Sequence, residues 1–156
     1  MNFLLTLLLL GQPNLPAAGQ TTWMRPDAFR LFIGMQRVDA LVALRESGFD
    51  VKDGGKPNES VVDYAGDKAL TLEFQKDRLH SIRFELFTFL PQARKAFEEE
   101  ARHLRKQRGG PKKETSALVI YDQALPNVMM VLSDDPKSEN GKKGIALLAV
   151  RYYDPR

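Results

Sequence analysis

The stretch LTLEFQKDRLHSIRFELF constrains the fold most strongly, because apolar and polar residues alternate along it. A period of two is typical of strands that bury one face. We predict a hairpin that turns at residues 76–78, in the register that pairs Leu72 with Ile82. Next to the turn, this register pairs Phe74 with His80. Because no glycine lies in the turn, a slightly longer loop is the alternative.

Helical spacing precedes and follows this alternating stretch. Residues 36–47 are predicted to form a helix, because apolar side chains recur along one side and Gly48 supplies a stop. A second helix is predicted from Pro91, which suits a first helical turn, to the breakers at residues 109–111. The predicted apolar stripes are Met35, Val38, Leu41, Val42 and Leu44 in the first helix, and Leu90, Ala93, Phe97, Ala101 and Leu104 in the second.

Three further strands are predicted after the second helix, at residues 116–121, 128–133 and 144–153. The chain then reads as helix, three strands, helix, three strands, with the second half displaced by about 55 residues. We therefore predict an α+β fold with the order α-βββ-α-βββ, a possible tandem repeat. In this two-layer arrangement, two helices pack on one face of an antiparallel sheet.

The first twenty residues, MNFLLTLLLLGQPNLPAAGQ, predict a secretory signal peptide. As a helix, the apolar run would cover roughly 16 Å, too little for a hydrocarbon core of about 30 Å. We expect a signal peptide at 1–19, a linker at 20–29 and one domain at 30–156, exported to a periplasm or the extracellular space. An apolar extension of a cytosolic protein is the alternative.

The chain has no cysteine, which excludes disulfides and a lipid-bearing cysteine.

The stretch FIGMQRVDALVALRESGFD, followed by LTLEFQKDRLHSI, resembles the SmpA/OmlA family of small bacterial outer-membrane assembly lipoproteins. The doubled order of helix and strands is also similar to that of the β-lactamase inhibitory protein family. The resemblance covers about residues 31–85 and implies an exported, non-catalytic scaffold that binds other proteins. This chain departs from both families: it has no cysteine to accept a lipid, and Trp23 lies in the predicted linker. No particular partner follows from the resemblance.

Positive charge is concentrated at the end of the second predicted helix. Residues 92–113 contain eight basic and three acidic residues, whereas the net charge of the whole chain is +3. Cations near a helix C-terminus are favoured by the helix dipole, so a solvated face is one interpretation. The other is a patch for an anionic envelope component such as lipid headgroups or lipopolysaccharide; no nucleic acid is expected as a partner. The candidate residues are Arg102, Arg105, Lys106, Arg108, Lys112 and Lys113.

The C-terminal strand sequences VMMVLS and IALLAV are apolar on both faces. A two-layer fold covers only one face of its sheet, so the second face of these strands must meet something else. We hypothesise that a protein partner or a second copy of the chain binds there. The alternative is that the linker and the N-terminal segment cover this face. The candidate residues are Met129, Val131, Leu148 and Val150.

The sequence contains no signature of a catalytic centre, such as a nucleophile elbow or a phosphate-binding glycine loop. Its two histidines, His80 and His103, lack the short spacing of metal ligands, so neither a metal nor a cofactor is expected. We predict an exported, non-catalytic binding or scaffold domain acting on envelope or secreted proteins. The alternatives are a periplasmic or secreted hydrolase using strand carboxylates such as Glu73 and Glu85, and a protein that binds anionic surfaces.

Overall fold

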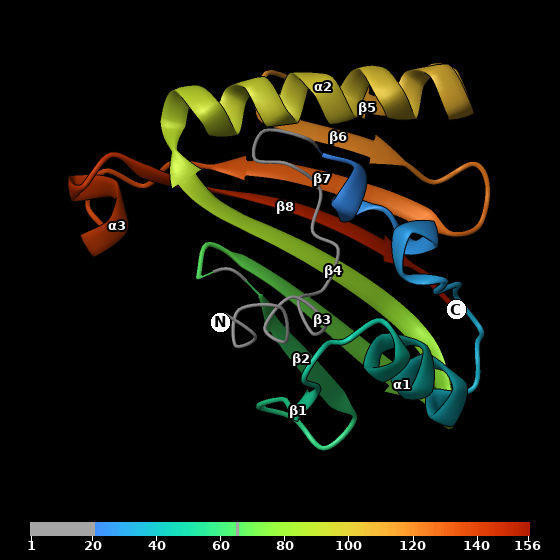
Figure 1. Ribbon diagram of the computed structural model, residues 1–156. Helices are drawn as coiled ribbons and strands as arrows, with labels where there is room; N and C mark the ends of the chain where they lie inside the picture. Colours follow the sequence, from blue (N-terminus) through green and yellow to red (C-terminus); the bar gives the residue numbers. More distant parts are fainter. Residues whose placement is uncertain (1–20, 65) are drawn as a thin grey trace, which may run out of the picture.

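The strands of the chain form one eight-stranded antiparallel sheet with the helices against it (Figure 1). The computed structural model describes residues 21–64 and 66–156. The strands are β1 (Lys52–Asp53), β2 (Glu59–Tyr64), β3 (Lys68–Gln75), β4 (Arg78–Phe89), β5 (Lys113–Glu114), β6 (Leu118–Tyr121), β7 (Asn127–Ser133) and β8 (Ile145–Tyr153). The described helices are η1 (Thr22–Met24), η2 (Pro26–Phe29), α1 (Arg37–Glu46), α2 (Leu90–Arg108) and α3 (Glu139–Lys142).

The strand order, β1-β2-β3-β4-β8-β7-β6-β5, shows how the two halves of the chain meet. The last strand of each half, β4 and β8, pair with each other at the centre, and the earlier strands of each half follow outward. This arrangement confirms the predicted α+β fold and the predicted order of elements. The two-residue edge strands β1 and β5 were not predicted, because two residues carry no readable period.

One row of buried side chains crosses the sheet from β2 to β6. Each member of the row pairs directly with the next across neighbouring strands, and all lie on the same face. The row consists of Val62, Leu70, Phe84, Val150, Met130 and Val119. Because the two halves supply three members each, the core is continuous through the pair of strands that joins them.

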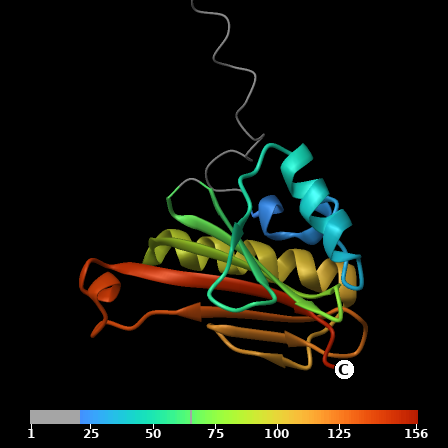
Figure 2. The ribbon, with the colours of Figure 1, turned by 90° about the horizontal axis from the view of Figure 1, so that it is seen from below.

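The helices cover one face of the sheet and leave the other face open. In Figure 2 the helices α1, α2, η1 and η2 lie together above the sheet, and the opposite side carries no helix. Helix α2 has Pro91 in its first turn and ends at Arg108, where Gly109 caps it with a positive φ of 78° that favours glycine, as predicted. Its buried stripe includes the predicted Ala93, Phe97 and Leu104. Helix α2 thereby supplies most of the second layer.

Helix α1 has the predicted bounds within a residue, but its predicted apolar stripe is only partly correct: Leu44 is buried, and Met35 and Leu41 pack against the core. Ala40 and Leu44 are its buried residues, whereas Val38 is 65% exposed and Val42 is 43% exposed. The predicted stripe was wrong for these two valines. A ten-residue helix offers several plausible apolar sides, and the side that meets the sheet is chosen by the packing of neighbouring segments rather than by spacing alone.

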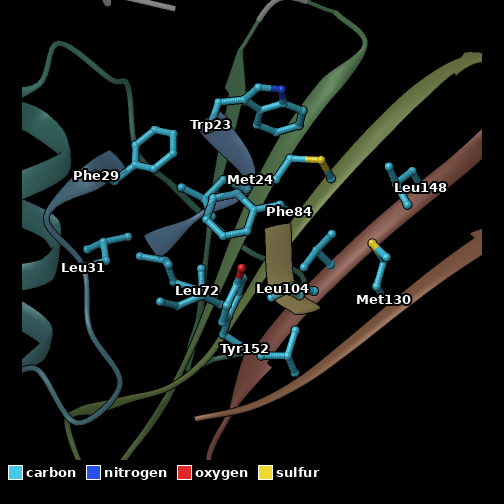
Figure 3. Packing of buried hydrophobic residues seen from close by; sticks show 14 of the residues in the cluster. Trp23, Met24, Phe29, Leu31, Leu72, Phe84, Leu104, Met130, Leu148 and Tyr152 are labelled. Atoms are coloured by element: carbon cyan, nitrogen blue, oxygen red, sulfur yellow. The ribbon is translucent and has the colours of Figure 1, made fainter. Parts of the chain in front are cut away.

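Residues 21–29, predicted to be part of a linker, belong to the hydrophobic core. Trp23 and Met24 in η1 and Phe29 in η2 are buried. The Trp23 ring meets Phe84 edge to face, with 6.2 Å between ring centroids. Figure 3 shows these side chains converging on Phe84 from the helix side. The segment packs on the helix-covered face and therefore does not cover the open face of the sheet. The alternative to a docking face, in which the linker covers the open face, is wrong for residues 21–29.

The hairpin of β3 and β4 has the predicted register away from its turn. Leu72 pairs with Ile82, as predicted. A bulge near the turn shifts the register, so Phe74 pairs with Leu79 rather than with His80. The prediction was wrong for this pair because a bulge inserts one unpaired residue, which an alternating sequence does not reveal.

The turn of this hairpin is shorter than predicted and contains no glycine. Lys76 and Asp77 form it, with positive φ values of 50° and 57°. Two consecutive left-handed residues match the right-handed twist of the strands, although asparagine and glycine are the usual occupants. The Asp77 carbonyl also accepts a hydrogen bond of 2.8 Å from the Arg37 N–H, so the turn fixes the start of α1.

The predicted signal peptide at 1–19 lies outside the described residues. Within residues 21–64 and 66–156, no helix is both long enough and apolar enough to span a membrane.

Candidate binding surface

Alternation along β7 and β8 assigns each of the four predicted sheet residues to a face. Met129 and Val131 lie on the open face and are half-buried. Leu148 and Val150 lie on the helix-covered face and are fully buried. The prediction was wrong to place all four residues on one face. When both faces of a strand are apolar, the sequence does not indicate which of its alternate residues point into the core. Leu148 and Val150 are therefore not available to a partner.

The open face of β6, β7 and β8 presents a contiguous group of half-buried apolar side chains, here called the apolar patch. Leu118 pairs with Val131, and Val131 pairs with Ala149. Ile120 pairs with Met129 in the neighbouring row. The apolar patch consists of Leu118, Ile120, Met129, Val131, Leu147 and Ala149. The sequence indicated this face through the apolar character of the strands but missed the four members other than Met129 and Val131.

Charged side chains border the apolar patch toward β3 and β4. Arg151 donates from Nη2 to the Glu73 carboxylate at 2.9 Å and from Nε to the Ser81 hydroxyl at 2.7 Å. Its guanidinium carbon also lies 5.1 Å from the centroid of the Tyr153 ring. These contacts hold the Arg151 side chain at the edge of the patch and leave its charge balanced.

The two strand carboxylates considered for hydrolysis are each paired with an arginine. Glu73 forms an ion pair with Arg151, and Oε1 of Glu85 lies 3.1 Å from Nε of Arg83. Glu73 lines a hollow of about 360 Å³ together with His80, but Glu85 does not line it. The two carboxylates therefore do not face one shared cleft, which is the arrangement that paired acid–base catalysis needs.

The short edges of the sheet make the face, rather than an edge, the accessible surface for a partner. Strands β1 and β5 each contain two residues, so neither edge offers a long row of unpaired backbone groups for strand addition.

Half of the predicted basic cluster is engaged in contacts within the chain. Arg105 is paired with Glu114, and Lys112 with Asp122. The hydrogen bond from Lys112 to Asp122 raises the pKa of the Lys112 ammonium. Arg108 donates from Nη1 to the carbonyl of Pro126 at 2.8 Å. These contacts give the three side chains structural roles between α2 and the β5–β7 segment.

The other predicted cations are exposed. Arg102, Lys106 and Lys113 have no ion-pair partner among the described residues. Arg102 lines a hollow of about 310 Å³ between α2 and the segment after β5, together with Arg94 and the buried ring of Phe97. Arg94 was not among the predicted residues. The basic surface is thus a strip along α2 rather than one cluster of six cations.

The part of the chain that the structure describes contains no candidate metal site, because no three metal-ligating side chains lie close together there. His80 lies at the bulge of the β3–β4 hairpin, and its carbonyl accepts a 3.0 Å hydrogen bond from the Asp154 N–H. His103 lies on α2 and is half-buried. The two histidines therefore occupy different parts of the fold.

Comparison of this chain with models of known protein families, with curated proteins and with solved structures found no match.

Proposed function

We propose that this chain is an exported, non-catalytic binding domain that holds a protein partner on the apolar patch. The observation that carries this proposal is the one-sided covering of the sheet. Helices pack on one face, whereas the opposite face of β6, β7 and β8 exposes parts of six adjoining apolar side chains. Contiguous apolar surface of this kind, rimmed by polar residues, is typical of interaction sites.

The order of elements agrees with what the resemblance to the SmpA/OmlA and β-lactamase inhibitory protein families implies, although membership in either family stays a prediction. Both resemblances imply a scaffold that binds other proteins. The expected secretory signal at residues 1–19 supports an envelope or extracellular partner over a cytosolic one.

The border of the patch indicates the chemistry of the partner surface. Because Arg151 and Arg83 are each balanced by a glutamate, the border has little net charge. A partner of either net sign can therefore approach, and its contacting centre should be apolar with a polar rim.

Photo-crosslinking in intact cells tests this proposal. The photoreactive residue p-benzoylphenylalanine is placed at Met129 in the patch or, as a control, at the exposed Val38 on α1. We expect a discrete adduct from position 129 and none from position 38. A second substitution, Val131→Arg, should abolish the adduct because it introduces an uncompensated cation into the centre of the contact.

Mass spectrometry of the adduct distinguishes a foreign protein from a second copy, because a second copy yields only peptides of this chain. Adducts of equal intensity from positions 129 and 38, or an adduct from position 129 that survives Val131→Arg, would contradict the proposal.

A second candidate function is binding to an anionic surface through the exposed strip of α2. The exposed Arg102 and Lys106 carry this alternative, because neither is neutralised by an ion pair among the described residues. Sedimentation with vesicles containing anionic lipid would show binding that weakens as salt rises. Reversing both charges to glutamate should remove it, whereas the same reversal at Lys137 and Lys143, beside α3, should not.

A further inference from the structure

A hollow of about 270 Å³ lies on the helix side of the sheet, away from the apolar patch. Three parts of the chain that are distant in sequence form it: η2 with the residues that follow it, the last turns of α2, and the end of β8. Pro126, in the connection between β6 and β7, closes one side. The site is therefore built by tertiary packing and does not arise from one helix end or one loop.

Tyr152 of β8 contributes a buried phenol to this hollow. Its side chain is 6% exposed, and its ring packs edge to face against Phe84. No hydrogen bond joins its hydroxyl to another of the described residues, and the oxygen is not sealed from solvent, so it is open to the hollow. Figure 3 shows the Tyr152 oxygen pointing away from its strand into the layer beneath the helices. A ligand in the hollow could accept this hydrogen bond.

The Tyr152 hydroxyl keeps its proton and can therefore donate a hydrogen bond. Burial, followed by the negative charge of Glu100, raises the pKa of the Tyr152 hydroxyl, so the proton stays on the oxygen at neutral pH. The hydroxyl can then donate to an oxygen acceptor but offers little to a cation.

Two arginines and one carboxylate also line the hollow. The charge of Arg25 is balanced by Glu100, and Asp27 contributes a negative charge to the wall. Arg108 is fixed by a carbonyl oxygen, which leaves its positive charge uncompensated by direct contact with a carboxylate among the described residues. The wall thus has one fixed guanidinium available to an anionic group.

Apolar side chains complete the rim. Phe32 is 61% exposed and lines the hollow beside Leu31 and Pro26. An aromatic ring left this exposed next to a polar floor offers contact area to an apolar ligand group.

We propose that this hollow binds a small apolar carboxylate, whose oxygens accept hydrogen bonds from Tyr152 and Arg108 while its apolar group packs against Phe32. The volume of about 270 Å³ is slightly below the usual range of ligand sites, about 300–1,000 Å³, and suits a group the size of one amino acid. The same chemistry occurs in a free carboxylic acid and in the last residue of a peptide. This inference does not depend on the partner of the apolar patch.

Calorimetric titration of the full chain with N-acetylphenylalanine tests the proposal, with the uncharged N-acetylphenylalaninamide as the matched probe. We expect the acid to bind at least about tenfold more tightly than the amide, because charged hydrogen bonds are the stronger ones. Tyr152→Phe should weaken binding of the acid about fivefold, since it removes one hydrogen bond and no volume.

A second variant does not depend on the stability of the core. Phe32→Ala changes an exposed position and should weaken the acid and the amide alike, whereas Val38→Ala, an equally exposed apolar position on α1, should change neither. A tripeptide acid ending in phenylalanine separates the two sources: equal affinity indicates a chain terminus, and loss of affinity indicates a free small molecule. Absence of binding by the acid at millimolar concentration, or affinity unchanged in both Tyr152→Phe and Phe32→Ala, would overturn the proposal.

Discussion

Arg25 and Glu100 form an ion pair that joins the N-terminal turns to helix α2. Nη2 of Arg25 lies 3.0 Å from Oε2 of Glu100, and Nε lies 3.3 Å from each carboxylate oxygen. The Glu100 side chain is fully buried, whereas that of Arg25 is 19% exposed. A buried carboxylate needs such a partner, because water cannot solvate its charge. The pair therefore makes the N-terminal turns part of the folded core.

We predict that Arg25→Met destabilises the protein by about 3 kcal/mol, because it leaves Glu100 buried without a partner. The double variant Arg25→Met/Glu100→Leu should be more stable than this single variant, since it removes the buried charge as well. Urea unfolding measures both, with Arg105→Met as the control. Arg105 forms an exposed pair, so its loss should cost at most about 1 kcal/mol. Equal losses at Arg25 and Arg105 would contradict this account.

The turn between β3 and β4 carries two residues in a conformation that disfavours their side chains. We predict that Lys76→Asn/Asp77→Gly stabilises the protein by about 1 kcal/mol, because these residues adopt positive φ readily. The hydrogen bond from Arg37 should persist, since it uses the backbone carbonyl of residue 77. Thermal unfolding checks the gain. Asp67→Gly serves as the control, because Asp67 has no positive φ and should lose stability.

The alternating and helical periods predicted the fold because packing in a sheet and on a helix face follows those periods. Leu72 and Ile82 show this for β3 and β4, and Ala93 and Phe97 show it for α2. The N-terminal turns could not be predicted in this way. Trp23 lies in a three-residue helix without any period, and only tertiary contact makes it part of the core.

The candidate surface was only half predictable for a related reason. An apolar strand such as β8 reads the same from either face, so its sequence does not tell Leu147 from Leu148. The face that α2 covers decides which leucine is buried. Likewise, Arg105 and Arg102 look alike in the sequence and are both exposed in the fold. Only Arg105 forms an ion pair, because the chain turns back after α2 and brings Glu114 to it.

Tyr152 should make the stability of the protein depend on pH under alkaline conditions. Its pKa in the folded state is raised, so the unfolded chain releases this proton at lower pH than the folded chain does. The stabilisation is fully present below about pH 10, the value of an unperturbed tyrosine, and falls by up to about 1.4 kcal/mol per pH unit above it.

Unfolding by urea between pH 9 and 11 should show this slope, and Tyr152→Phe should reduce it. A smaller slope should remain, because burial also raises the pKa of Tyr121. A slope that is the same with and without the Tyr152 hydroxyl would show that another group causes the loss.

Asp154 should titrate at unusually low pH. Hydrogen bonds from the Arg156 side chain and N–H lower the pKa of its carboxyl to about 2. A lowered pKa stabilises the folded state above about pH 4, and this contribution is lost as the pH falls toward 2. NMR titration of the Asp154 carboxyl carbon should give this midpoint. Arg156→Ala should move the midpoint only part of the way toward about 3.9, because the backbone N–H still donates.

Neighbouring residues of the same type on β7 and β8 test the assignment of the two sheet faces. Met130 and Leu148 are fully buried, whereas Met129 and Leu147 are half-buried on the open face. Met130→Ala and Leu148→Ala should each cost about 2–5 kcal/mol, since each leaves a cavity in the core.

The matched substitutions Met129→Ala and Leu147→Ala should each cost less than about 1 kcal/mol, because water can fill the space that they leave. Urea unfolding of the four variants gives the comparison. A loss at Met129 as large as that at Met130 would mean that the open face is covered within the folded chain, and the apolar patch would then not be free to bind a partner.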